Sequence, residues 1–190
     1  MQRTHSVAIV SIFVALILGS NYLLAPLANV KLEDTMVFVA SYLYGIGIGA
    51  SVAILAETAW STISPYGFAG AIMPFLVAGE LIYAIAGYFA SKIWNGDGIF
   101  SSRNIAFGSI MAVCAFIWDF ETNAATGLIA QGGRLGLNTL LSYEAFGLPF
   151  MISHELSDFA FGAFVAPTII YYATRRIWNL NRRLALKEGA

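Results

Sequence analysis

Acidic side chains are the residues of this sequence that could do chemistry, because most of them interrupt long apolar runs. Ionisable groups inside a membrane-spanning segment are costly and usually serve a function. Carboxylates in such a setting can bind a cation or an amine, or accept hydrogen bonds from a polar ligand. Seven carboxylates and one histidine lie within the apolar runs or at their edges: Glu57, Glu80, Asp119, Glu121, Glu144, Glu155, Asp158 and His154.

Helical spacing places several of these residues on shared faces. Residues three or four positions apart lie next to each other on a helix. The pairs with this spacing are Glu57 and Trp60, Glu80 and Tyr83, Asp119 and Asn123, and His154 and Asp158. Rings such as Trp60 and Trp118 could stack on a ligand or make cation–π contacts. We therefore expect a ligand pocket, although each acid alone could cap a helix and the rings could form an interfacial belt.

The composition excludes a soluble domain. Of 190 residues, 58% are hydrophobic and 11% are charged, where a soluble domain has about 25% charged residues. A single cysteine, Cys114, excludes a disulfide framework, and with two histidines it also excludes a Cys/His zinc cluster. No phosphate-binding loop or catalytic motif is present in the sequence. We expect a cell-membrane protein that is not an enzyme and has no cofactor, no resident metal and no nucleic-acid partner.

A membrane-spanning helix needs about 20 mostly apolar residues. Glycines 45, 47 and 49 weaken the centre of one apolar run, which is either one long helix or two short ones. We expect an all-α, single-domain bundle of six transmembrane helices, with five spans as the alternative. The apolar runs are Val7–Ala25, Met36–Thr62, Ile72–Lys92, Asn104–Ile129 and Ala145–Arg176, and the predicted polar loops are 27–35, 95–98 and 131–143.

Basic residues predict the orientation. With six spans and both termini in the cytoplasm, eight of the ten basic residues lie inside, in agreement with the positive-inside rule. Five spans give the same count, because Arg3 and Lys31 change places. In both topologies the acids within the bundle fall in its outer half. The inside residues of the six-span topology are Arg3, Lys92, Arg103, Arg175, Arg176, Arg182, Arg183 and Lys187, and the outside residues are Lys31 and Arg134.

Small residues form a stripe on the first predicted helix. Ser11, Ala15 and Gly19 follow at four-residue steps, which lets another helix approach closely. The stripe predicts either packing within the bundle or a docking face for a partner membrane subunit.

Several short motifs resemble those of the substrate-binding S components of energy-coupling factor (ECF) transporters. They are residues 26–32 (PLANVKL), 45–50 (GIGIGA), 64–70 (SPYGFAG), 73–75 (MPF) with Gly79, and 154–158 (HELSD) with the later Pro167. The resemblance covers most of the chain, and S components are six-helix membrane proteins of about this length. Members that transport nickel or cobalt have a histidine directly after the initiating methionine, where this sequence has Gln2.

The resemblance implies uptake of a vitamin-like molecule. The substrate would bind under the loop after the first helix, to which Asn29 and Lys31 belong. Ser11, Ala15 and Gly19 would dock on a transmembrane coupling subunit that is driven by two ATPase subunits. The many carboxylates favour a cationic or amine-bearing substrate, for example a thiamine-like one. The expected substrate-binding residues are Asn29, Trp60, Glu80, Tyr83, Trp118, Asp119, Asn123, His154, Glu155 and Asp158.

Three other functions remain open from the sequence. An ion- or proton-handling protein could use the acids around His154, namely Asp119, Glu121, Glu155 and Asp158. A metal-dependent intramembrane hydrolase could use the same histidine and carboxylates. A non-catalytic accessory subunit of a membrane complex would need only the stripe of small residues.

Overall fold

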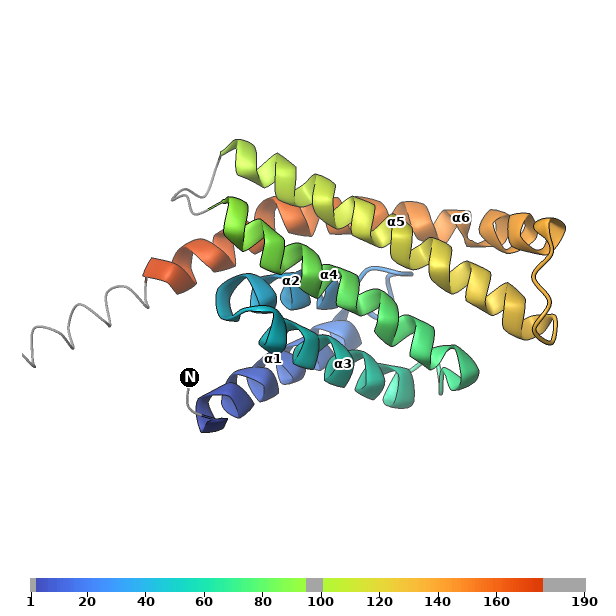
Figure 1. Cartoon of the computed structure of the whole chain (residues 1–190), viewed down its shortest axis with the longest axis horizontal. Coiled ribbons are helices and arrows are strands. Elements are labelled where there is room, and N and C mark those ends of the chain that lie inside the picture. Colours follow the sequence, from blue (N-terminus) through green and yellow to red (C-terminus); the bar gives the residue numbers. More distant parts are fainter. Residues whose placement is uncertain (1–2, 95–100, 176–190) are drawn as a thin grey trace, which may run out of the picture.

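The computed structural model describes residues 3–94 and 101–175, and these residues form an all-helical protein with no strand. Figure 1 shows the chain. The predicted loop at 95–98 and the basic residues beyond Arg175 lie outside the described residues. The elements are α1 (Arg3–Leu24), α2 (Glu33–Tyr44), α3 (Ile46–Ile63), the short 3-10 helix η1 (Gly70–Ile72), α4 (Met73–Ile93), α5 (Ser102–Ala130), α6 (Leu137–Ala160) and the π-helical turn η2 (Phe161–Val165).

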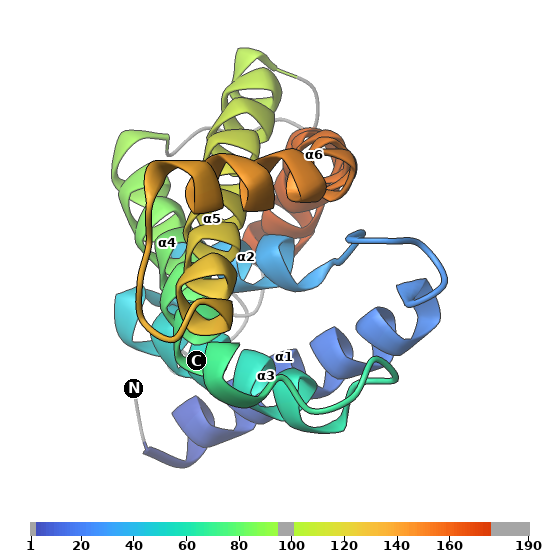
Figure 2. The same cartoon turned by 90° about the vertical axis from the view of Figure 1, so that its right-hand side faces the viewer.

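Successive helices run in opposite directions along the bundle (Figures 1 and 2). One end, called here the loop end, holds residues 25–32, 64–69 and 131–136. The opposite end holds the start of α1, the turn between α2 and α3, the end of α4 and the start of α5. Because of this alternation, the segments that follow α1, α3 and α5 all lie toward the loop end, with the α5–α6 turn extending farthest (Figure 1).

Within the part of the chain that the structure describes, five helical segments are long and apolar enough to cross a membrane: Arg3–Leu24, Ile46–Ile63, Gly70–Ile93, Ser102–Ala130 and Leu137–Arg175. The remaining helix, α2, has 12 residues and a length of about 18 Å, which is shorter than the hydrocarbon core of about 30 Å. Gly45 separates α2 from α3 with a φ of 90°, a conformation that suits glycine. The run 36–62 therefore forms two helices, the second alternative of the sequence prediction.

Two boundaries differ from the prediction. Helix α2 begins at Glu33, so Glu33 and Asp34 occupy its first turn, where acids suit the helix dipole, and both are fully buried. Helix α6 begins at Leu137, well inside the predicted loop 131–143. Gly132 and Gly133 adopt positive φ values of 61° and 89°, so the turn after α5 is completed within a few residues.

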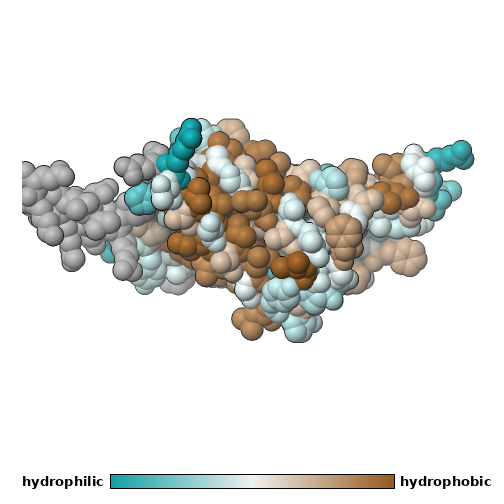
Figure 3. Space-filling view, turned by 90° about the horizontal axis from the view of Figure 1, so that it is seen from below, coloured by the Kyte–Doolittle hydropathy of each residue, from teal (hydrophilic) through white to brown (hydrophobic). Residues whose placement is uncertain are grey.

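The helices pack closely where glycines face a neighbour. Gly87 of α4 lies against the backbone carbonyl of Phe38 on α2, and Gly108 of α5 lies against that of Phe159 on α6. Large apolar side chains point outward instead, for example Leu23 (79% exposed) and Phe146 (80% exposed). Apolar residues also dominate much of the face seen in Figure 3, as expected for a surface in contact with lipid.

Candidate ligand-binding site

A cavity of about 270 Å³ opens at the loop end, between α1, the α1–α2 loop, α3 and α5. Its walls include the rings of Trp60, Tyr66 and Trp118, the Lys31 ammonium and the Glu57 carboxylate. Aromatic walls with a few polar groups are typical of a small-molecule site. The loop after the first helix thus forms part of the cavity wall.

A second cavity, of about 340 Å³, lies beside the first. Both cavities are lined by Asn29, Tyr66 and Trp118, so these three side chains form the boundary between them. The second cavity is also lined by Asp119 and Thr122 of α5, Asn123, and Gly147 and Phe150 of α6. A ligand larger than the first cavity could reach the second by displacing the boundary side chains.

Side-chain hydrogen bonds fasten the α1–α2 loop to the bundle. Asn29 has a φ of 57°, and its Nδ2 donates to Asp119 Oδ1 and to the Phe150 carbonyl, each at 3.2 Å. Ser153 Oγ of α6 donates to the Ala28 carbonyl at 2.9 Å, and the Tyr66 hydroxyl donates to the Ala25 carbonyl. The loop is therefore tied to both α5 and α6.

Lys31 extends from this loop into the first cavity. Its Nζ lies 3.9 Å from Glu57 Oε2 and 4.7 Å from the centre of the Trp118 ring. Burial alone would lower the pKa of Lys31, but the neighbouring carboxylates, Glu57 foremost, outweigh it and raise that pKa. The ammonium group is therefore charged at neutral pH and offsets part of the negative charge of the site.

Two tryptophans are held in place around the cavity. Trp118 Nε1 donates to the Leu76 carbonyl at 3.3 Å, and Trp60 makes edge-on contacts with the rings of Tyr22 and Tyr66 at centroid distances of 5.3 and 6.2 Å. Gly79 allows the Trp118 indole to lie directly against α4, because a Cβ at position 79 would overlap its Cδ1. The rings thus present fixed surfaces to a ligand.

A buried polar network lies next to the cavities, around His154. His154 Nδ1 is 3.0 Å from Asp119 Oδ2, and Nε2 is 3.4 Å from Asp34 Oδ2 and 3.8 Å from Asp158 Oδ2. The His154 ring contacts the edge of Trp118 at a centroid distance of 5.4 Å. Trp118 and Asp119 therefore belong to the cavity walls and also touch this network.

The predicted site residues fall into three groups. Asn29, Trp60, Trp118, Asp119 and Asn123 line a cavity. The second group, Glu80, Tyr83, His154 and Asp158, is fully buried and lines neither cavity. Glu155 is partly exposed and also lines neither cavity.

Four polar residues of the site were missed by the sequence prediction: Asn21, Glu33, Asp34 and Ser61. Asn21 Nδ2 donates to Glu33 Oε2 at 2.6 Å, and Ser61 Oγ donates to Glu57 Oε1 at 2.5 Å. Glu33 and Asp34 were assigned to a solvated loop. The signal that could have found them is an acidic pair directly before an apolar run, the pattern of a first helical turn.

Comparison with known proteins adds no further constraint: no family model, curated protein or solved structure matches the chain.

Proposed function

We propose that the chain is the membrane-embedded, substrate-binding S component of an ECF-type ABC transporter, with a vitamin-like, cationic or amine-bearing substrate. The observation that carries this proposal is the cavity of about 270 Å³ under the loop that follows the first helix. S components bind their substrate in that position. The motifs at residues 26–32 and 64–70, which carry the resemblance, contribute Asn29, Lys31, Tyr66 and other residues to the cavity wall.

The chemistry of the cavity supports a substrate with a flat ring and a positive or hydrogen-bonding group. Trp60 and Trp118 offer faces for stacking. Glu57 offers a carboxylate whose Oε2 lies 3.9 Å from Lys31 Nζ, a long distance for an ion pair. An amine of the substrate could share the Glu57 carboxylate. The adjoining cavity adds Asp119 and Asn123 as further polar partners.

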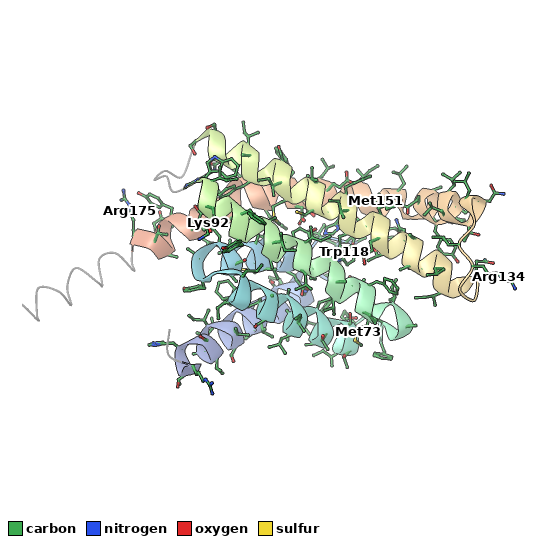
Figure 4. The ribbon with its side chains drawn as sticks, viewed as in Figure 1. Met73, Lys92, Trp118, Arg134, Met151 and Arg175 are labelled. Atoms are coloured by element: carbon green, nitrogen blue, oxygen red, sulfur yellow. The ribbon has the colours of Figure 1, made fainter. Side chains whose placement is uncertain are left out.

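The proposed topology has six passes with both termini in the cytoplasm. It is supported by the alternating directions of the six helices, α2 being a short pass inside the bundle. Lys92 and Arg175 lie at one end of the bundle and Arg134 at the other, as Figure 4 shows. This distribution agrees with a cytoplasmic opposite end and an external loop end.

The stripe of small residues supports docking on a coupling subunit. Ser11, Ala15 and Gly19 are all exposed on α1, so the stripe does not pack within this bundle. No atom lies within 4 Å of a Cβ built at Gly19. A partner helix could therefore approach α1 along this face without displacing the substrate cavity.

Native mass spectrometry of the gently purified protein tests the proposal. We expect a co-purified small molecule, or a mass shift on incubation with a panel of vitamins that includes thiamine. The Trp60→Ala variant should lose the bound mass, whereas Phe116→Ala, an exposed ring on α5, should keep it. Absence of binding to every member of the panel by a folded wild-type protein would contradict the proposal.

A further inference from the structure

The buried network around His154 contains a set of metal-ligand atoms. One atom from each of Asp34, His154 and Asp158 lies within 4.8 Å of the other two, and all three residues are 0% exposed. Tetrahedral coordination at about 2.1 Å would separate two ligand atoms by about 3.4 Å. The distances from His154 Nε2 to Asp34 and Asp158, 3.4 and 3.8 Å, are close to that separation.

His154 is oriented as a metal-ligating histidine. Its Nδ1 lies 3.0 Å from Asp119 Oδ2, where an Nδ1–H would donate to this carboxylate, and its Nε2 faces Asp34 and Asp158, where it would present its lone pair to a bound ion. A carboxylate behind the imidazole fixes the tautomer and strengthens the ligand in known metal sites. Asn29 in turn donates to the other Asp119 oxygen at 3.2 Å.

A further buried carboxyl group, that of Glu80, lies next to the three candidate ligands. Glu80 is 0% exposed and its carboxyl group lies within hydrogen-bonding reach of Asp34, so the two acids must either share a proton or be balanced by a cation. Asp158 is also 0% exposed, and the described group within hydrogen-bonding reach of its carboxyl, besides His154, is the Tyr83 hydroxyl. Buried charges are ordinarily paired or bound to a metal.

Among the described residues, the cations near this cluster are fewer than its carboxyl groups. Lys31 lies nearest Glu57 and also acts on Asp34 and Glu80, and an imidazolium at His154 would balance only one of its three carboxylate neighbours, Asp34, Asp119 and Asp158. A bound divalent cation would supply two further positive charges. An imidazole nitrogen together with carboxylate oxygens suits first-row transition cations better than Mg²⁺ or Ca²⁺, which prefer oxygen ligands alone.

We propose that Asp34, His154 and Asp158 bind one divalent first-row transition cation, such as Zn²⁺ or Mn²⁺, with Asp119 positioning the histidine. The ion would join α2 and α6 inside the bundle, behind Trp118 of the ligand cavity, whose ring contacts His154. This site is distinct from the proposed substrate cavity, whose lining includes none of these three ligands.

Metal binding to the full chain tests this proposal. The protein is purified in detergent through a tag that contains no histidine, stripped with a chelator, and titrated with Zn²⁺ and with Mn²⁺. We expect about one ion per chain by elemental analysis after desalting. Asp34→Asn and Asp158→Asn should each weaken binding at least tenfold, and Asp119→Asn about 10- to 100-fold. The matched control is Glu121→Gln, two residues from Asp119 and partly exposed, which should bind like the wild type.

A spectroscopic measurement on the wild type keeps the proposal testable if the variants do not fold. Bound Mn²⁺ should show electron spin-echo modulation from one directly coordinated imidazole nitrogen. No stoichiometric uptake of either ion, wild-type affinity in both Asn variants, or bound Mn²⁺ without the nitrogen signal would each overturn the proposal. Such a result would mean that the buried carboxyl groups are protonated and uncharged. It would leave the vitamin-binding test unaffected.

Discussion

At the scale of single residues, Lys31 and Glu57 show how the cavity tolerates buried charge. The Lys31 side chain is 12% exposed and that of Glu57 is 1% exposed, and their charged atoms are 3.9 Å apart. Removing one member of a buried pair leaves the other charge uncompensated, which costs more than the pair itself contributes. The pair therefore makes the loop after α1 and the end of α3 depend on each other.

Replacing Lys31 alone should destabilise the protein. Lys31→Met leaves Glu57 Oε2 buried without its cation, and we expect a loss of about 3 kcal/mol in the free energy of unfolding. The double variant Lys31→Met/Glu57→Gln should recover part of that loss, because the remaining side chain is neutral. Thermal unfolding in detergent measures both effects. Equal stability of the single variant and the wild type would show that water or another group already solvates Glu57.

The buried partners of His154 show the limit of sequence reasoning at this scale. The spacing of His154 and Asp158 predicted a shared helical face, and the structure places both in one network. Asp34 is 120 positions from His154 in the chain, and no periodicity relates the two residues. Only the tertiary fold brings the first turn of α2 within side-chain reach of α6, so the sequence could predict the carboxylates but not the ligand set.

At the scale of elements, glycines set how closely the helices approach. A Cβ at Gly87 would overlap the backbone oxygen of Phe38, and backbone atoms cannot rotate away as a side chain can. Gly47 of α3, by contrast, has no atom within 4 Å of an added Cβ. The two positions therefore form a matched pair for testing helix packing.

The contact between α2 and α4 should tolerate no added methyl group. We expect Gly87→Ala to lower the free energy of unfolding by about 1–3 kcal/mol, because the two helices must move apart. Gly47→Ala should be neutral or slightly stabilising, since alanine favours a helix by up to about 1 kcal/mol over glycine. Thermal unfolding of the two variants under identical conditions provides the measurement. A stable Gly87→Ala protein would indicate a looser α2–α4 contact.

The exposed stripe on α1 leads to a prediction about assembly. Gly19→Leu adds a large side chain to a surface with open space around it, so folding and ligand binding should not change. A coupling subunit that packs on the stripe should no longer co-purify, and ATP-driven uptake should be lost with it. Val113→Ala, exposed on α5 and therefore away from the stripe, is the control. Normal uptake by Gly19→Leu would place the docking face elsewhere.

The helices themselves could largely be predicted, because apolar length and turn residues determine them locally. Val7–Ala25 corresponds to α1, and the three glycines correctly marked the break at Gly45. The early start of α6 could not be predicted from polarity, since the polar residues of 137–144 are helical and partly or fully exposed. Polar composition indicates contact with water, which a helix outside the hydrocarbon core satisfies as well as a loop does.

At the scale of the whole molecule, the topology decides which side of the membrane the two adjoining cavities face. Six alternating passes place the start of α1 and the start of α5 at the same end, opposite the loop end. Five passes would instead require the start of α1 and the α5–α6 turn to lie on the same side of the membrane. The distribution of basic residues does not distinguish the two topologies. The accessibility of chosen positions from outside the cell must do so.

Single cysteines should separate the two topologies. In a Cys114→Ala background, cysteine is placed at the exposed positions Thr4, Ser102 or Gln131 and tested with a membrane-impermeant maleimide on intact cells. We expect labelling at position 131 without permeabilisation, and labelling at positions 4 and 102 only after it. Labelling of positions 4 and 131 together would establish five passes. In that case α1 would run opposite to its direction in the bundle, and the loop carrying Asn29 and Lys31 could not close the cavity beside Trp118.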